Sequence, residues 1–501
     1  FHSRVTTDAF RGSGSDPTAC TRRTRRVRQQ CTRTIAGAAL LASVATTAIA
    51  VSPPVTASAA DSRCVSPISM TALPEGQVFE VPAWIDATGQ ADMSDALQQW
   101  IAANASKLSG SVDRQNVLRF PQGARYKMSK SLILAKRGNF GIPGAMYPNL
   151  PVFKLENVVV DFNGSTIEQL LTVPFLDGTG DLHNRFGNPM VFTVGSSGIE
   201  LRNGHLVGSD PTGKWDADRF NWPAITISGD PSDDWTERVW VHDMQIEDVW
   251  GDFVMIQADA NVLHRVVIED NTMRTSGRQG IVVNGGTDVT VRHNGLFDVG
   301  RLVIDSEPAM LDGFSNVVFQ ANYGDPGPIG YAQISLPANG TLAERIGFLD
   351  NTVTNGNLRI EIQGSPDVVR SCAVVTGNQN LGSSLYRPSV TSPFLIKVGR
   401  WQNVTVRNNF DRAYPLKGIR AINLDLATDV DSGANCMRGA TDDTCPTPDT
   451  TAPAVPVPSV TSKTAATVCL TWPASTDIDL VAYYTVLRNG TNLGTVTGTQ
   501  Y

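Results

Sequence analysis

The chain has 501 residues, of which 41% are hydrophobic and 18% charged, and its net charge is −7 at pH 7. That length suits about two to four domains with a sizeable core, and the acidic balance argues against nucleic acid and anionic membranes as partners. The 44 Gly and 29 Pro, together with many Val, Thr and Asn, favour short strands joined by turns.

Residues 1–59 have the pattern of a secretory signal peptide. Six arginines lie between residues 22 and 33, residues 35–51 are uncharged and small or apolar, and Ala57-Ser58-Ala59 offers a cleavage site. A membrane anchor is the alternative interpretation of the apolar run. Cleavage leaves 33 basic and 46 acidic residues, a net charge of −13. We therefore expect a secreted, extracellular monomer that binds neither nucleic acid nor, after cleavage, membranes.

Residues 60–80 are predicted to form a linker or an early cap, and one amphipathic helix follows. Ser94 suits the N-cap position, and Leu97, Trp100 and Ile101 share one helical face. Because a stack of coils exposes the apolar cross-section of its first coil, we expect this helix to cover that end.

From residue 118 onward, short alternating apolar runs recur, each followed by an asparagine. A period of this size indicates one stacked unit, and because the units are strands we predict a parallel β-solenoid over residues 81–445. Asparagine tolerates the left-handed bend after a strand, and its amide can bond the asparagine one coil away. The series, with gaps of 23 to 30 residues, is Asn271, Asn294, Asn322, Asn351, Asn378 and Asn408, and Asn163 and Asn203 carry the same signal earlier.

The same interval sets a register for the strands that precede the asparagines. Side chains alternate between the two faces along a strand. The inward positions are predicted to be Val254, Ile281, Ile304, Ala332 and Ile360. The outward positions then form two columns on one exposed sheet, Met255, Val282, Asp305, Gln333 and Glu361 beside Gln257, Asn284, Glu307, Ser335 and Gln363.

Acidic side chains on this face are the candidate catalytic residues. Asp305 and Glu307 lie about 6.6 Å apart along one strand, and Glu361 lies about 10 Å from Asp305 across two coils. Either separation is compatible with the carboxylate pair of a glycosidase, because crowding two carboxylates raises the pKa of one of them. A solvated face without a catalytic role is the alternative.

Asp252 aligns beside Arg278 at the strand entrances. The pair is either a structural ion pair or an accessory catalytic carboxylate beside an arginine that binds a uronate carboxylate or stabilises developing negative charge. Other polar residues on or near this face are predicted to bind substrate, namely Gln279, Arg301, Gln257, Asn284, Gln333 and Lys397.

We expect no cofactor and no resident metal. An acidic loop could hold calcium, although a solvated loop explains it better; its carboxylates are Asp230, Asp233 and Asp234.

The composition changes at the end of the coils. Cys436 and Cys445 lie close together, and in an oxidising exterior we predict a disulfide between them. Residues 446–458 form a stiff linker rich in Pro and Thr. Residues 459–501 alternate as strands, with a hairpin turn predicted at Asn489-Gly490. This segment resembles the first half of a bacterial fibronectin type III module with Trp472 in its core, which implies a partial β-sandwich.

Residues 78–430 resemble the secreted pectate-lyase-like superfamily. Residues 85–89, Ile-Asp-Ala-Thr-Gly, with the helix after them are similar to its amino-terminal cap, and residues 158–167 to its first full coil. The resemblance implies an all-β chain that forms a right-handed, single-stranded parallel β-helix with an N-terminal capping helix.

The resemblance also implies activity on polysaccharides. Polygalacturonase-type relatives carry three aspartates on successive coils, whereas this chain matches only one of them, Asp252, and has Arg278-Gln279 in place of the paired aspartates. We therefore expect a glycoside hydrolase or polysaccharide lyase that binds a plant or microbial glycan along the sheet. The alternatives are a non-catalytic glycan-binding or cell-surface protein and a surface spacer.

Overall fold

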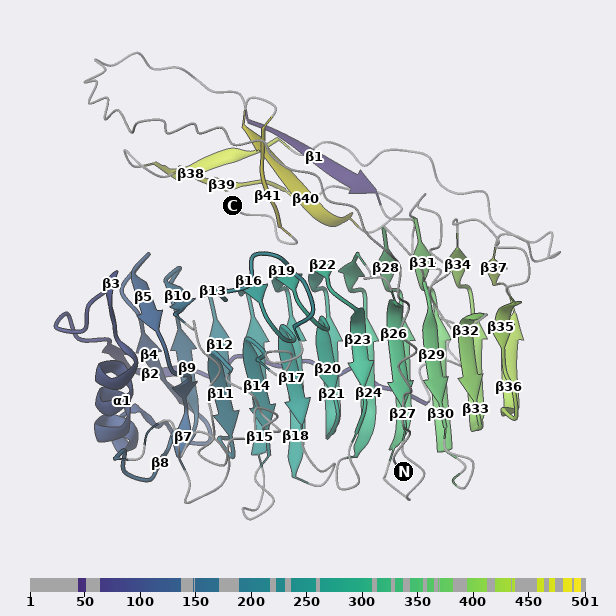
Figure 1. Cartoon of the computed structure of the whole chain (residues 1–501), viewed down its shortest axis with the longest axis horizontal. Helices are drawn as coiled ribbons and strands as arrows, with labels where there is room; N and C mark the ends of the chain where they lie inside the picture. The colour runs from purple at the N-terminus through teal and green to yellow at the C-terminus, as the bar shows by residue number, and fades with distance from the viewer. Residues whose placement is uncertain are drawn as a thin grey trace, which may run out of the picture. The chain divides into compact units, whose positions relative to one another are not determined.

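The computed structural model describes residues 44–50, 64–136, 147, 149–170, 189–216, 222–229, 236–257, 262–308, 313–325, 329–336, 343–354, 358–364, 368, 370–381, 394–411, 420–433, 435–437, 457–463, 468–473, 481–488 and 491–496. Most of them form a right-handed parallel β-helix, as predicted, in which successive strands of the chain pass to three different sheets (Figure 1). Among these residues, no helix is long and apolar enough to cross a membrane.

The first and second sheets each contain 12 parallel strands. The first sheet comprises β2 (Glu75–Glu80), β4 (Gln115–Arg119), β9 (Val158–Asp161), β12 (Ile199–Arg202), β15 (Thr236–His242), β18 (Leu263–Glu269), β21 (Gly286–Arg292), β24 (Phe314–Gln320), β27 (Ala343–Leu349), β30 (Arg370–Thr376), β33 (Trp401–Arg407) and β36 (Thr428–Gly433). The second comprises β3 (Thr88–Asp92), β5 (Arg125–Met128), β10 (Thr166–Gln169), β13 (His205–Val207), β16 (Gln245–Val249), β19 (Thr272–Ser276), β22 (Gly295–Val299), β25 (Tyr323–Gly324), β28 (Thr352–Val353), β31 (Gln379–Asn380), β34 (Phe410–Asp411) and β37 (Cys436–Met437).

The third sheet contains 10 parallel strands and carries the predicted site. It comprises β6 (Leu132–Ile133), β11 (Val191–Val194), β14 (Ile225–Ser228), β17 (Val254–Gln257), β20 (Ile281–Val283), β23 (Leu302–Ser306), β26 (Gly330–Ser335), β29 (Ile360–Gln363), β32 (Phe394–Gly399) and β35 (Arg420–Asn423). Inward-facing apolar residues of all three sheets pack into one continuous core. A short antiparallel pair, β7 (Ala135–Lys136) and β8 (Phe153–Lys154), lies outside them.

Helix α1 (Ser94–Leu108) is next to the first coils in Figure 1. Leu97 and Ile101 are buried in the core, whereas Trp100 is only partly buried. The side-chain amide of Gln98 accepts the N–H of Ile133 and donates to its carbonyl, each at 2.9 Å. Ile133 lies in β6, an edge strand of the third sheet. The helix therefore covers the core and also satisfies main-chain groups at a sheet edge.

The predicted N-cap of this helix is wrong by one position. Met93 occupies it without a side-chain cap. Ser94 is the first helical residue, and its N–H and Oγ both donate to Asp92 Oδ1, at 3.0 and 2.6 Å. The aspartate two residues earlier thus accepts the bonds at the helix start.

The recurring asparagines form a buried ladder along the β-helix axis. From Asn271 to Asn409, each Nδ2 donates to the Oδ1 of the next asparagine and to a main-chain carbonyl one coil back, and each of these Oδ1 atoms also accepts a main-chain N–H. The Nδ2 of Asn435, the last member, donates to the Val406 carbonyl. For Asn322 the two amide bonds reach Val291 at 2.8 Å and Asn351 at 3.0 Å. The members are Asn271, Asn294, Asn322, Asn351, Asn378, Asn409 and Asn435.

The sequence prediction therefore chose the wrong one of two adjacent asparagines in one coil. Asn409 is the ladder member, whereas Asn408 has φ 55° and forms the left-handed bend before it. Asn163 and Asn203 are likewise bend residues, with φ 51° and 57°. The bend and the ladder need different residues. The side-chain amide points inward from the residue that follows the bend, and not from the bend residue itself.

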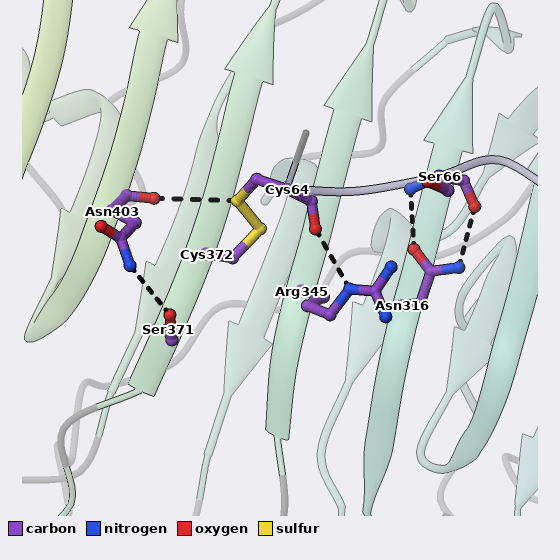
Figure 2. The surroundings of a disulfide bond; sticks show 7 residues. All are labelled: Cys64, Ser66, Asn316, Arg345, Ser371, Cys372 and Asn403. Atoms are coloured by element: carbon purple, nitrogen blue, oxygen red, sulfur yellow. Dashed lines mark hydrogen bonds between the residues drawn. A yellow bond between two sulfur atoms is a disulfide. The ribbon is translucent and has the colours of Figure 1, made fainter. Parts of the chain in front are cut away.

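Residues 64–74, called the strap here, belong to the segment predicted to be a linker or an early cap. Figure 2 shows Cys64 in a disulfide with Cys372 of β30, 308 residues away, with a Cα separation of 5.7 Å. Arg345 of β27 donates to the Cys64 carbonyl at 3.1 Å, and Asn316 of β24 exchanges two bonds of 2.8 Å with Ser66 (Figure 2). Ile68 donates to Thr290 of β21. The strap thus crosses several strands of the first sheet.

No local feature of the sequence indicates the Cys64–Cys372 disulfide. Cys436 is also disulfide-bonded. Its predicted partner, Cys445, lies outside the described residues, so that pairing stays a prediction.

The C-terminal segment forms antiparallel pairs. β38 (Ser459–Lys463) pairs with β39 (Val468–Thr471), and β40 (Val481–Arg488) pairs with β41 (Thr491–Val496) and with β1 (Val44–Ala50). Pairing of Arg488 with Thr491 confirms the predicted hairpin. The fibronectin-like sandwich and the signal peptide remain predictions.

Replacing Asn409 with alanine should destabilise the protein far more than replacing Asn408. The Asn409 change leaves the main-chain N–H and one amide hydrogen of Asn378 without their shared acceptor, and the Val375 carbonyl without its amide donor, whereas Asn435 Oδ1 keeps the Asn409 main-chain N–H. We expect a loss of about 3 kcal/mol or more in the free energy of unfolding, against about 1 kcal/mol for Asn408→Ala, which only places alanine in a left-handed bend. Denaturant unfolding of both variants measures this; equal losses would contradict the ladder.

Replacing both Cys64 and Cys372 with serine should lower the free energy of unfolding by about 2–5 kcal/mol, because the disulfide closes a very long loop of the unfolded chain. The measurement is the denaturant midpoint of the oxidised protein. Identical midpoints for the wild type and the double variant would show that the strap is not held by this bond.

Candidate active site

The predicted register of the third sheet is confirmed strand by strand. Val282 pairs with Asp305, Asp305 with Gln333, and Gln333 with Glu361. Glu361 then pairs with Lys397, which places the lysine in the same outward column. The five predicted inward residues, Val254, Ile281, Ile304, Ala332 and Ile360, all lie in the core.

The centre of the outward face is not simply solvated. Met255, Val282 and Asp305 point away from the core, yet they are only 3%, 1% and 1% exposed. Glu307, two residues after Asp305, keeps a side chain that is 55% exposed. The solvated-face interpretation therefore fails for Asp305 and fits only Glu307.

Asp252 and Arg278 form the expected ion pair at the strand entrances. Arg278 Nη1 donates to Asp252 Oδ2 at 3.0 Å, and the Gln279 main-chain N–H donates to Asp252 Oδ1 at 3.0 Å. Burial raises the pKa of the fully buried Asp252 to about 6, although Arg278 opposes this rise. Asp252 in turn raises the pKa of Arg278.

Gln279, predicted to bind substrate, has both amide atoms engaged by the protein. It is 2% exposed. Its Nε2 donates to Asp305 Oδ2 at 2.8 Å, and its Oε1 accepts the Leu302 N–H at 2.8 Å. These bonds link the entrance of β20 to both ends of β23.

Asp305 has the most perturbed environment of the predicted catalytic residues. Burial, and then the charge of Glu307, raise the pKa of Asp305 to about 7, while Arg278 and Arg301 oppose the rise. Its Oδ1 atom has no hydrogen-bond partner in the described part of the chain. A carboxyl group in this state can carry a proton near neutral pH.

Glu307 lies at the open side of this group. Its main-chain N–H donates to Asn284 Oδ1 at 2.8 Å, and its Oε2 is 3.7 Å from Arg278 Nη2. Arg301, at the entrance of β23, is partly exposed. The structure thus brings together Asp252, Arg278, Gln279, Asp305 and Glu307, which we call the carboxylate cluster.

Glu361 belongs to a separate network two strands away. Arg359 and Gln363 donate to its carboxylate, and Lys397 Nζ lies 2.9 Å from Oε1. Burial would raise the pKa of Glu361, but the bonds from Lys397 and Arg359 hold it below its usual value. Sequence reasoning did not single out Arg359, although this residue directly precedes β29 and lies two positions before Glu361, so alternation predicts the same face for both.

The two remaining predicted substrate ligands also have neighbours within the protein. Gln333 Nε2 donates to Ser335 Oγ at 2.9 Å. Gln257 is 7% exposed.

The described residues include no group of three or more His, Cys, Asp or Glu arranged to hold a metal ion. Asp230, Asp233 and Asp234, the candidate calcium ligands, lie outside them.

No protein-family model and no curated protein matches this chain. Solved structures resemble it at low identity. An α-1,3-glucanase catalytic unit from Streptomyces thermodiastaticus is 14% identical, with 77% of this chain and 73% of that chain covered and a TM-score of 0.42. An endo-xylogalacturonan hydrolase from Aspergillus tubingensis is 13% identical, with 72% of this chain and 100% of that chain covered and a TM-score of 0.41. The Streptococcus pneumoniae surface adhesin PfbA is 11% identical, with 82% of this chain and 98% of that chain covered and a TM-score of 0.40. At these values the likeness carries no argument about activity.

Asp305→Asn should stabilise the protein at alkaline pH. The folded-state pKa of Asp305, about 7, lies above the ordinary aspartate value of 3.8, so the folded state holds the proton more tightly and wild-type stability falls as pH rises from about 4 to about 7. Asparagine keeps an acceptor for Gln279 without the charge. We expect a gain of about 2–4 kcal/mol at pH 8 that vanishes near pH 4. Thermal unfolding across this range tests it; a gain independent of pH would contradict the buried titration.

Proposed function

We propose that this protein is a secreted polysaccharide-processing enzyme, a glycoside hydrolase or a polysaccharide lyase, that binds a glycan along the outer face of the third sheet. One observation carries the proposal. Asp305, a buried carboxyl group with a pKa raised to about 7, lies in β23 two residues before the exposed Glu307, which directly follows this strand. Carboxyl groups with separated proton affinities are what general acid–base catalysis requires.

Asp305 is the proposed general acid. Hydrolysis and elimination both need a proton on the departing glycosidic oxygen, so the same acid serves either reaction. Since Asp305 is 1% exposed, the proton leaves through its unpartnered Oδ1 to a substrate oxygen, or to a water, that reaches this atom.

Glu307 is the proposed base or nucleophile. It removes a proton from water in a hydrolase or from the sugar in a lyase, or it attacks the sugar directly. Its exposure allows direct contact with substrate.

Basic and polar groups around the cluster are proposed to hold the glycan. Arg278, between Asp252 and Glu307, keeps the local charge balanced, and Arg301 offers a guanidinium to an acidic sugar or to developing negative charge. Asn284, directly after β20, and Lys397 of β32 extend this surface across the strands. Glu361 is proposed to orient Lys397 through their ion pair.

The first experiment is a product screen on pectins, rhamnogalacturonans, alginates and xylans, read by new reducing ends and by absorbance of unsaturated uronates. On the substrate found, Asp305→Asn and Glu307→Gln should each lower kcat by about 100-fold or more. Wild-type activity should fall above about pH 7, because the acid must be protonated.

Ser335→Ala, in the neighbouring column, is the control for a general disturbance of the face. Full activity of the Asp305→Asn and Glu307→Gln variants would refute the assignment.

The burial of Asp252 and Asp305 favours a second candidate function, a non-catalytic β-helix that binds glycan. In that case the buried carboxylates only hold the coils together. Glycan-array binding without new reducing ends or unsaturated products would support it.

A further inference from the structure

The orientation of the Gln279 amide is fixed by a group that can only donate. The Leu302 main-chain N–H, 2.8 Å from one end of the amide, requires an oxygen there. The other end, 2.8 Å from Asp305 Oδ2, is therefore the NH₂ group. This assignment follows from the chemistry of the partners, which removes the usual ambiguity between the two ends of an amide.

The fixed amide makes the two oxygens of Asp305 unequal. Oδ2 faces an N–H donor, so a proton on Oδ2 would bring two donors against each other. Oδ1 has no partner among the described residues. The neutral carboxyl group therefore carries its proton on Oδ1.

Asp252 holds the main chain at Gln279 in place. Its Oδ1 accepts the Gln279 N–H and its Oδ2 accepts Arg278, each at 3.0 Å. The charged groups that act on Asp305 are Glu307, Arg278, Asp252 and Arg301. Only Gln279, which is neutral, is both buried and bonded directly to the Asp305 carboxyl group in the described structure.

We propose that Gln279 is a positioning residue, whose amide directs the transferable proton of Asp305 to Oδ1. This inference rests on the proposed function, in which Asp305 is the acid. Gln279 was predicted to bind substrate; here it orients the Asp305 carboxyl group instead. Asp252 holds Gln279 in place by accepting its main-chain N–H.

The test observes the Asp305 carboxyl group itself. Infrared difference spectra between about pH 5 and 9 contain a protonated-carboxyl band, identified by its loss in Asp305→Asn. In Gln279→Leu the carbonyl oxygen loses its donor, so this band should move to higher wavenumber. The midpoint of its titration should rise by about one pH unit, because the carboxylate form loses a hydrogen bond.

Gln279→Glu covers the case in which Gln279→Leu does not fold. Its carboxylate still accepts the Leu302 N–H, but its other oxygen donates only when protonated. The two acids should then share a proton, and the Asp305 midpoint should again rise.

Gln333→Leu is the matched control, since Gln333 pairs with Asp305 in the neighbouring strand while its Nε2 donates to Ser335. It should leave the band and its midpoint unchanged. An unchanged band and midpoint in both Gln279 variants, an equal shift in Gln333→Leu, or no band lost in Asp305→Asn would each overturn the proposal. These readouts need no substrate, so a failed glycan screen would refute the proposed function while the Gln279 bond is judged separately.

Discussion

The β-helix depends on the stacking of successive coils at one constant register. Parallel pairing brings each strand beside its equivalent in the next coil, and the buried asparagine ladder holds this alignment at every turn from Asn271 to Asn435. A slip by one residue would turn the apolar columns outward and the polar columns inward. The register therefore has to be maintained over many coils, and the ladder does so with amides that bond both the next amide and the main chain.

The same stacking creates the carboxylate cluster. Asp252 precedes β17, Gln279 precedes β20 and Asp305 lies in β23, so three adjacent strands contribute to one network of hydrogen bonds. Burial of Asp305 and Asp252 disfavours their charged forms. Neutral side chains of similar shape would hold the coils without this cost, and this supports the catalytic role that we propose for Asp305.

The strap adds contacts that stacking alone does not provide. In a solenoid each coil touches mainly its immediate neighbours. Residues 64–74 cross this pattern, because the disulfide reaches β30 while hydrogen bonds reach β27, β24 and β21. Val65 also packs on Val318 and Val374 of the first sheet. The strap therefore couples several coils that would otherwise separate one at a time.

The sequence by itself determined the repeating fold, the capping helix and the register that pairs Asp305 with Gln333 and Glu361 with Lys397, because alternation and period are local properties of a chain. Only the tertiary structure decided between Asn408 and Asn409, since both satisfy the pattern and only one points inward. It alone joined Cys64 to Cys372, a pairing without any local signal. It also decided that Asp305 is buried while Glu307, directly after the same strand, is exposed. Alternation predicts an outward position for both residues, and burial depends on what other segments lie over each of them.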